Sequence, residues 1–108
     1  MVEAIDRFDI VLVQLNPTVG SEIQKTRPCI VVSPNQMSAL NTLIVAPMTS
    51  KGFDFVFRPK IKFDNKVGLV LLDQIRAVDK TRVIKKLGQL PPSKAKQIAH
   101  TLTQMFEY

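Results

Sequence analysis

The apolar residues of this chain change their spacing once, near residue 93, and no other feature of the sequence limits its fold so strongly. Before that point, β-branched and aromatic residues gather in short segments separated by Pro, Gly, Asn and Ser, which is typical of strands joined by turns. From Ser93 onward an apolar stripe follows helical spacing; its members are Ala95, Ile98, Ala99, Leu102, Met105 and Phe106. Pro91 and Pro92 fit just before this helix. The pattern predicts a mainly β protein, a small barrel or strongly curved sheet with one C-terminal helix on it.

The strands can be placed from the same spacing. We expect them over residues 8–15, 28–33, 43–47 and 67–78, with a half-buried strand or hairpin over 53–63 and a short edge strand within 81–90. A loop or one helical turn is expected over 34–41. Residues 8–15 are apolar on both faces, which indicates a central strand. Residues 67–78 are expected to bend near Asp73 and Gln74.

Residues 53–63 alternate with a period of two. Phe53, Phe55, Phe57, Ile61 and Phe63 share one face, which we expect to lie in the core. Arg58, Lys60 and Lys62 share the other face and are interpreted as a solvated basic stripe that protects an edge, rather than as a track for RNA. Pro59 has no N–H and must therefore lie at an edge, a bulge or a bend.

Length and charge limit the partners. The chain has 108 residues, of which 45% are apolar, and this fits one folded domain over residues 1–108. Fifteen Lys and Arg against nine Asp and Glu give a net charge of +6, which favours polyanions such as nucleic acids, although charge can also serve solubility alone. Residues 1–9 carry three acidic side chains and no apolar core of the kind found in signal peptides, so we expect no signal segment. No apolar run is near the roughly 20 residues that span a bilayer. We expect a cytoplasmic protein that does not contact membranes.

Several nuclease mechanisms lack their side chains here. A mechanism with two histidines as acid and base is excluded, because His100 is the single histidine of the sequence. We expect His100 to face solvent beside the helical stripe. Cys29 alternates with Ile30 in a strand and is interpreted as a buried structural thiol; as the single cysteine it forms no internal disulfide. The carboxylates are dispersed and no phosphate-binding glycine motif occurs, so we expect no metal and no cofactor.

Arginine, lysine, hydroxyl and amide groups around two loops remain, and they suit phosphate chemistry. Arg27 begins a strand directly after a polar loop, where its planar fork of donors could stabilise the charge that develops on a phosphate. Thr49 ends another strand, and its hydroxyl could donate to a phosphate oxygen. From these residues alone, a structural salt bridge for Arg27 and a turn cap for Thr49 are equally well supported.

Three motifs decide between these alternatives. They are residues 20–33 (GSEIQKTRPCIVVS), 45–50 (VAPMTS) and 71–79 (LLDQIRAVD), the last followed by Arg82 and by Gly88-Gln89-Leu90; residues 9–13 (DIVLV) stand upstream of the first. In this order and near this spacing they resemble the MazF/PemK family of toxin endoribonucleases over nearly the whole chain. The departure is Arg7-Phe8, where the family usually has Arg-Gly before the aspartate.

The resemblance implies a fold and an activity. Family members have an SH3-like small barrel, the MazF/CcdB-type plasmid toxin fold, and form homodimers. They cleave single-stranded RNA, including mRNA, at short sequences without a metal: the 2′-hydroxyl attacks, leaving a 2′,3′-cyclic phosphate and a 5′-hydroxyl. The family's catalytic arginine and threonine fall on Arg27 and Thr49. An acidic antitoxin protein that covers the cleavage groove is the implied partner, and the charge of +6 suits it.

Further residues are candidates for RNA binding; they are Ser21, Glu22, Gln24 and Lys25 in the first loop, Ser50 and Lys51 after Thr49, and Asp73, Gln74 and Arg76 in the third motif. Gln74 is suited to contacting a base edge. Glu22 could accept from a base amino group or could pair with Lys25, and the sequence does not decide between the two.

Two other functions explain the sequence less well. A non-enzymatic toxin of the CcdB type, which binds DNA gyrase on a similar fold, would leave the Arg27 and Thr49 pair unexplained. A plain single-strand RNA-binding module needs exposed aromatic rings for stacking, and only 6% of the residues are aromatic.

Overall fold

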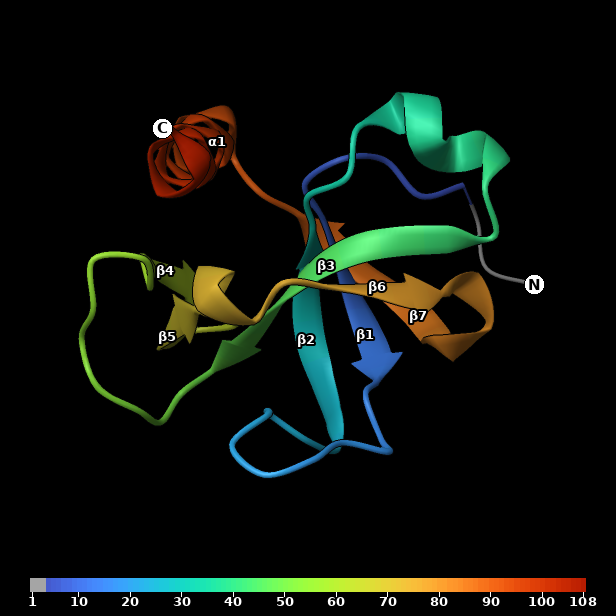
Figure 1. The fold of residues 1–108 in the computed structure, drawn as a ribbon, viewed down its shortest axis with the longest axis horizontal. Coiled ribbons are helices and arrows are strands. Elements are labelled where there is room, and N and C mark those ends of the chain that lie inside the picture. The colour runs from blue at the N-terminus through green and yellow to red at the C-terminus, as the bar shows by residue number, and fades with distance from the viewer. Residues whose placement is uncertain (1–3) are drawn as a thin grey trace.

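The computed structural model describes residues 4–108 and consists of a strongly curved, seven-stranded antiparallel sheet with one helix covering one end of it (Figure 1). The strands are β1 (Asp9–Gln14), β2 (Thr26–Val31), β3 (Thr42–Thr49), β4 (Lys60–Phe63), β5 (Lys66–Val70), β6 (Arg76–Asp79) and β7 (Val83–Gln89), and the helix is α1 (Pro92–Phe106). Short 3₁₀ helices span Asn35–Ala39, Leu72–Gln74 and Lys80–Arg82. The predicted fold class, mainly β with a C-terminal helix, is confirmed.

The sheet curls because β3 changes partner along one edge. The strand order is β4-β5-β3-β2-β1-β7, and β6 also pairs with β3. The first half of β3, Thr42–Val45, pairs with β6, whereas Met48 and Thr49 at its end pair with β5. The β4–β5 hairpin therefore turns away from β6 and closes against the end of β3.

Two apolar clusters occupy the two sides of the central strands. Ile10 and Ile30 belong to the first cluster, on which Ile98 of α1 packs with no exposed surface. Val11 and Cys29 alternate with them and belong to the second cluster on the other side. Strand β1 is thus buried on both faces between β2 and β7, as its sequence predicts.

The structure corrects the prediction for residues 53–63. Only Lys60–Phe63 forms a strand, and residues 50–59 are an irregular segment that joins β3 to β4. Phe53 and Phe55 are 67% and 49% exposed, so their expected place in the core was wrong. A period of two indicates which side chains lie on the same side of a strand, but it does not indicate whether another element packs on that side.

The predicted solvated basic stripe is confirmed for Lys60 and Lys62, which are both exposed, but it was wrong for Arg58. Arg58 does not face solvent: it makes a two-pronged ion pair with Asp73, with Nε–Oδ1 and Nη2–Oδ2 distances of 3.0 and 2.8 Å. Lys60 pairs with Asp54 at 3.2 Å. Arg58 lies before Pro59, where the chain bends, so it does not continue the face of β4.

Other elements follow their predictions with small differences. Residues 67–78 bend at Asp73 and Gln74, as expected, but the bend is a 3₁₀ helix that separates two strands. Helix α1 begins one residue early, at Pro92, and Cys29 is buried as expected. Phe106 was assigned to the apolar stripe but is 69% exposed at the last turn. Within residues 4–108, no helix is long and apolar enough to cross a bilayer.

Candidate active site and RNA-binding clefts

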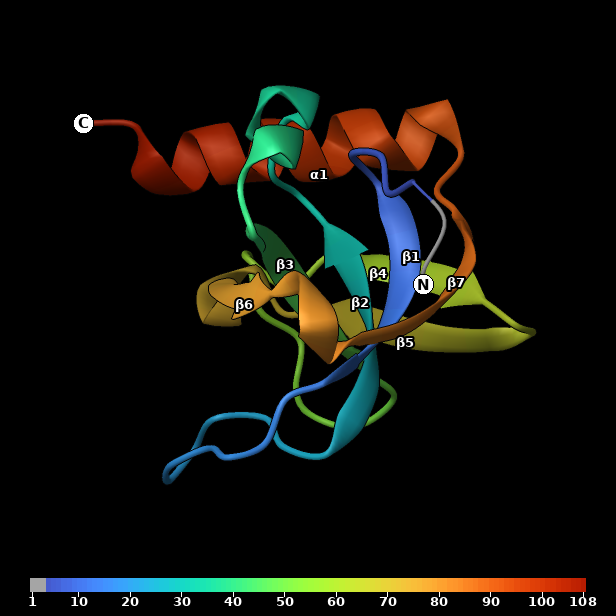
Figure 2. The same ribbon diagram turned by 90° about the vertical axis from the view of Figure 1, so that its right-hand side faces the viewer.

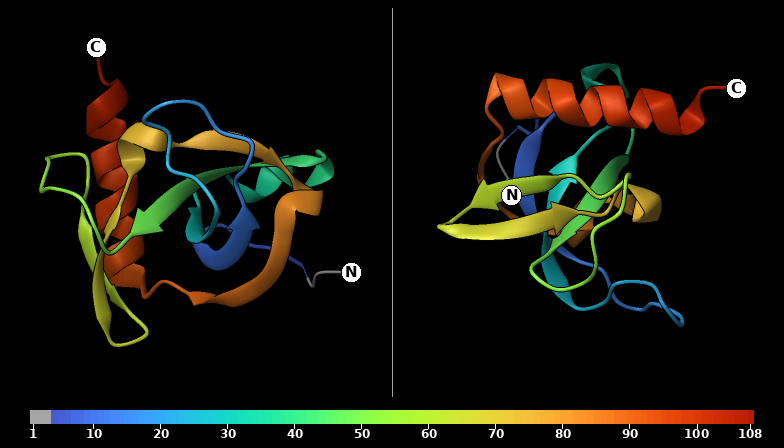
Figure 3. Two further views of the ribbon diagram at one scale, coloured as in Figure 1. Left: turned by 90° about the horizontal axis from the view of Figure 1, so that it is seen from below. Right: turned by 90° about the vertical axis from the view of Figure 1, so that its left-hand side faces the viewer.

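Two long loops leave the sheet at the end opposite α1 (Figures 2 and 3). One, residues 15–25, joins β1 to β2, and the other, residues 50–59, joins β3 to β4. In an antiparallel sheet the start of β2 and the end of β3 lie side by side, which brings the residues that flank both loops together.

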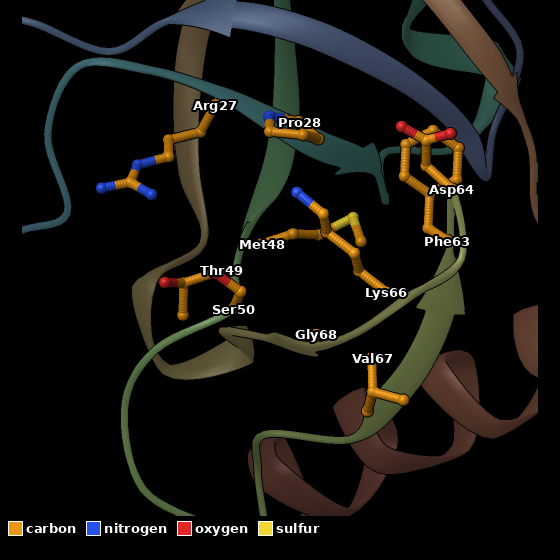
Figure 4. A pocket seen from close by; sticks show the side chains of 10 residues that line it. All are labelled: Arg27, Pro28, Met48, Thr49, Ser50, Phe63, Asp64, Lys66, Val67 and Gly68. Carbon is orange, nitrogen blue, oxygen red and sulfur yellow. The ribbon is translucent and has the colours of Figure 1, made fainter.

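Arg27 and Thr49 meet because of the register between β2 and β3. The paired residues Cys29 and Pro47 fix this register. Continued by two residues, it sets Arg27 opposite Thr49, and opposite residues of an antiparallel pair point to the same side. Both side chains line one cleft of about 220 Å³, and Figure 4 shows them extending in the same direction. The two predicted catalytic residues therefore share a site.

Arg27 has a fixed orientation and free donors. Its Nε donates to the backbone carbonyl of Gln24 at 3.1 Å, which directs the guanidinium away from the strand. Among the described residues no carboxylate forms an ion pair with it. The structural salt bridge considered from the sequence is therefore not formed, and the terminal nitrogens can donate to an anion.

Thr49 keeps its own proton for a ligand. Its Oγ1 accepts from the backbone N–H of Lys51 at 3.1 Å, which is the turn cap that the sequence allowed. A hydroxyl that accepts one hydrogen bond can still donate another. Strand β5 holds this residue closely: a Cβ built on Gly68 would lie 3.2 Å from the Thr49 carbonyl oxygen. Turn cap and phosphate ligand are compatible roles.

The same cleft contains residues that the sequence analysis missed. Ser50 was predicted, but Asp64 from the turn of the β4–β5 hairpin and Lys66 at the start of β5 also line the cleft, with Phe63 and Val67 (Figure 4). The turn itself is visible in the sequence, because Asp64 and Asn65 tolerate the positive φ angles of 55° and 62° that they adopt. That the hairpin closes against β3 depends on long-range pairing, which no local signal reports.

A second cleft of about 360 Å³ holds four of the predicted RNA-binding residues: Glu22, Asp73, Gln74 and Arg76. Gln74 accepts the N–H of Ile23 at 2.7 Å and so fastens the first loop, leaving its amide NH₂ group to donate. Glu22 accepts the N–H of Val19 at 2.7 Å, and within the described part of the chain it makes no ion pair with Lys25.

The remaining predicted residues are exposed parts of the two loops. Ser21, Gln24 and Lys25 lie in the first loop and Lys51 in the second, and none of them lines either cleft. Two arginines hold the base of the first loop: Arg76 donates to the Leu15 carbonyl at 3.0 Å, and Arg82 donates to the carbonyls of Gln14 and Asn16. Arg76 is thus partly structural.

The charges around the clefts are fixed by hydrogen bonds. The two N–H···O bonds from Arg58 lower the pKa of Asp73, and the same bonds raise the pKa of Arg58. Both groups therefore stay ionised at neutral pH. Across residues 4–108, no group of three or more His, Cys, Asp and Glu side chains could hold a metal ion. His100 is exposed on α1, away from both clefts.

Fold and site together define a small curved-sheet protein with a cleft at the ends of β2 and β3, lined by Arg27, Thr49 and the β4–β5 hairpin. The family of PemK-like, MazF-like toxins of type II toxin–antitoxin systems matches residues 6–106, and the chain belongs to this family. It is 36% identical over 94 residues to the endoribonuclease PemK of Escherichia coli, covering 81% of this chain and 71% of that protein. It is 31% identical over 104 residues to the endoribonuclease MazF of Staphylococcus saprophyticus, covering 89% and 86%.

Solved structures agree on the fold. The MazF crystal structure from Deinococcus radiodurans has a TM-score of 0.83 with this chain at 22% identity and covers 96% of this chain and 97% of its own. An endoribonuclease from a mycobacterial species, solved in complex with its cognate antitoxin, has a TM-score of 0.77 at 17% identity, covering 94% and 93%.

Proposed function

We propose that this protein is a sequence-specific endoribonuclease toxin that cleaves single-stranded RNA, mRNA included, without a metal. The observation that carries the proposal is the meeting of Arg27 and Thr49 in one cleft, where the Arg27 guanidinium forms no ion pair with any described carboxylate. The relatives that cover most of the chain are named endoribonucleases, which supports the same activity.

The reaction needs only the RNA, the cleft and solvent water, which takes the proton of the 2′-hydroxyl and supplies one to the 5′-oxygen. The ribose 2′-oxygen attacks the adjacent phosphorus, the bond from phosphorus to the 5′-oxygen breaks, and the proton lost by the 2′-hydroxyl is balanced by one gained at the 5′-oxygen. The products are a 2′,3′-cyclic phosphate and a 5′-hydroxyl. Negative charge builds on the non-bridging oxygens during attack, where Arg27 and the Thr49 hydroxyl donate to them. Because a guanidinium stays protonated in proteins, Arg27 acts by stabilising charge.

The second cleft is suited to reading bases beside the cut. The carboxylate of Glu22 can accept from an exocyclic amino group, and the free NH₂ of Gln74 can donate to a base edge. Because Gln74 also fastens the first loop at Ile23, its position is fixed before RNA arrives. The exposed Ser21, Lys25 and Lys51 would contact the sugar and phosphate backbone.

The partners follow from charge and from the relatives. An acidic antitoxin would be attracted to a toxin of charge +6, and the mycobacterial endoribonuclease was solved with its cognate antitoxin. A homodimer in the cytoplasm, where mRNA is translated, is part of the proposal.

Incubation of the purified protein with a long RNA in EDTA tests the proposal. We expect discrete fragments with 5′-hydroxyl ends, which polynucleotide kinase labels without prior dephosphorylation. The variants Arg27→Ala and Thr49→Ala should lose most cleavage, by about 10²-fold or more as for other oxyanion donors. Arg7→Ala, which removes an exposed arginine that precedes β1, is the matched control and should cleave normally.

Each alternative gives a different result. Loss of cleavage in EDTA would assign the chemistry to a metal. Intact RNA with the wild-type protein would favour a non-enzymatic toxin of the CcdB type, and gyrase inhibition would then be the assay. Fragments from Arg27→Ala at the wild-type rate would remove Arg27 from the site.

A further inference from the structure

The segment between β3 and β4 presents aromatic rings to solvent. Phe53 and Phe55 are 67% and 49% exposed, and neighbouring rings meet edge to face, with centroids 6.4 Å apart for Phe53–Phe55 and 5.9 Å apart for Phe55–Phe57. Phe57 is half-buried and packs on the first core cluster. The three rings thus form a continuous row from the core to solvent, in the place where the sequence suggested a buried face.

This row is held in place by polar contacts. The guanidinium carbon of Arg58 lies 4.7 Å from the centre of the Phe53 ring, and Arg58 is itself fixed by its two-pronged ion pair with Asp73. The N–H of Arg58 donates to the Phe55 carbonyl at 2.9 Å, and the N–H of Leu72 donates to the Phe57 carbonyl at 3.2 Å. The rings are therefore oriented without any ligand, and a cation stands against one side of Phe53.

The row lies beside the candidate catalytic pair. A Cβ built on Gly52 would be 3.7 Å from Nη1 of Arg58 and 4.0 Å from Cγ2 of Thr49, so both side chains flank the same glycine. Phe53, which Arg58 contacts, is the next residue. The exposed Lys51 precedes Gly52 and adds positive charge. Figures 2 and 3 place the whole segment at the end of the sheet where the first loop also lies.

We infer that Phe53 and Phe55 are a stacking surface for one base of the RNA next to the scissile phosphate; this inference rests on the proposed function. Every base has an aromatic face that stacks on exposed rings, and the surrounding cations hold the backbone that carries it. Arg58 polarises Phe53 from one side, and the base covers the exposed part of the ring. Single-stranded RNA is favoured over a protein partner because the exposed Lys51 precedes the rings and Arg27, which forms no ion pair among the described residues, lines the cleft that Thr49 shares. The charges of Arg58 and Asp54 are balanced by Asp73 and Lys60. The row selects for unpaired RNA, since a base in a duplex has no free face.

Steady-state cleavage of a short RNA, chosen by mapping the fragments of a long one, tests the inference first. Phe53→Leu and Phe55→Leu should each raise KM by roughly tenfold, since stacking on one ring contributes about 1–3 kcal/mol per base, and should leave kcat within about twofold. Phe53→Tyr and Phe53→Trp keep a ring and should keep the wild-type KM. Phe106→Leu removes a ring from α1 whose exposure, 69%, is close to the 67% of Phe53, and it is the matched control.

Fluorescence reports stacking directly. The same RNA is made with a 2′-deoxy sugar at the cleavage point, which removes the attacking group, and with 2-aminopurine at each flanking position in turn. We expect the wild-type protein to change the fluorescence at one position, and Phe53→Leu to abolish that change. An unchanged KM in both leucine variants, or fluorescence changes that persist in them, would overturn the inference. So would a change in oligomeric mass in the leucine variants with KM unaltered, because the rings would then contact protein. Failure of the wild-type protein to cut any RNA would instead reject the proposed function.

Discussion

Cys29 and Arg27 lie two residues apart on the same side of β2, yet their surroundings are opposite. Cys29 has no exposed surface and its Sγ donates weakly to the Arg27 carbonyl at 3.5 Å, whereas Arg27 reaches the open cleft. Burial raises the pKa of the Cys29 thiol to about 12, although the nearby Arg76 opposes this shift. The thiol is therefore protonated and shielded at every pH at which the enzyme would work, and it takes no part in the chemistry.

Alkylation measures this protection. We expect iodoacetamide to leave Cys29 unmodified in the native protein between pH 7 and pH 10, since the reactive thiolate is formed only near the raised pKa. In guanidinium chloride the same thiol should react readily, because its pKa returns to about 8.5. Thr103→Cys places a thiol at an exposed position of α1 and should be alkylated in the native protein. Native labelling of Cys29 at pH 8, detected by mass spectrometry, would contradict its burial.

At the same scale, the sequence predicts the candidate catalytic pair, Arg27 and Thr49, better than the residues around it. Arg27 follows a polar loop and Thr49 ends an apolar strand, so their positions at strand ends could be predicted from local pattern. Lys66 and Asp64 could not, because they reach the cleft only when the β4–β5 hairpin pairs with the end of β3. Glu22 is a middle case: its position in the loop was foreseen, but its bond to the Val19 N–H depends on how that loop turns back.

Among the elements, the segment between β3 and β4 is joined to the 3₁₀ helix Leu72–Gln74 by one ion pair. Arg58 and Asp73 supply it, with side chains only 14% and 30% exposed, and this partial burial makes it stronger than a surface pair. Because Arg58 also supports Phe53, the pair connects the second cleft to the aromatic row. Removing the carboxylate should loosen both.

The stability of Asp73→Asn should depend on pH in a defined direction. The bonds from Arg58 lower the pKa of Asp73 below its ordinary value, so its stabilisation is present above about pH 4 and is lost as pH falls through the lower, folded-state pKa. We expect the variant to be less stable than wild type by about 1 kcal/mol from pH 5 to 8, with the difference vanishing toward pH 2. Urea unfolding at each pH measures it. Asp54→Asn, which breaks the exposed pair with Lys60, is the control and should show no difference. If the free energy of unfolding of Asp73→Asn stayed below that of wild type by a constant amount down to pH 2, the ion pair would not be the source of the difference.

Elements could be predicted from the sequence where the spacing of apolar residues matches the side that is buried in the structure. Strand β1 is apolar at every second position on both sides, and only a central strand can bury both sides. Residues 53–59 show the failure: three alternating phenylalanines carry the same pattern whether a neighbouring strand covers them or not. Among the described pairings no strand joins them, and Pro59 interrupts the ladder before β4 begins. An exposed functional row and a buried strand face are therefore indistinguishable by pattern alone.

At the scale of the whole molecule, the helix and the two long loops lie at opposite ends. Helix α1 packs on the first core cluster at one end of the curved sheet, whereas both long loops leave the other end (Figure 2). Residues that flank these loops contribute to the two clefts. A net charge of +6 attracts any polyanion near the molecule. Counterions are released from the RNA, however, only where a protein cation contacts one of its phosphates. The salt dependence of binding therefore distinguishes a local site from a general charge attraction.

For the RNA with a 2′-deoxy sugar at the cleavage point, the logarithm of the binding constant should fall linearly with the logarithm of the salt concentration. Each lysine that contacts a phosphate contributes a slope of about −0.7 on a single strand, so Lys51→Ala should make the slope shallower by about that amount. Lys96→Ala removes the same charge from the exposed surface of α1, at the other end of the molecule, and should leave the slope unchanged while lowering net charge equally. Fluorescence anisotropy between 50 mM and 300 mM salt measures both. Equal slopes for the two variants would mean that the RNA is held by overall charge. The loop between β3 and β4 would then not contact the bound strand.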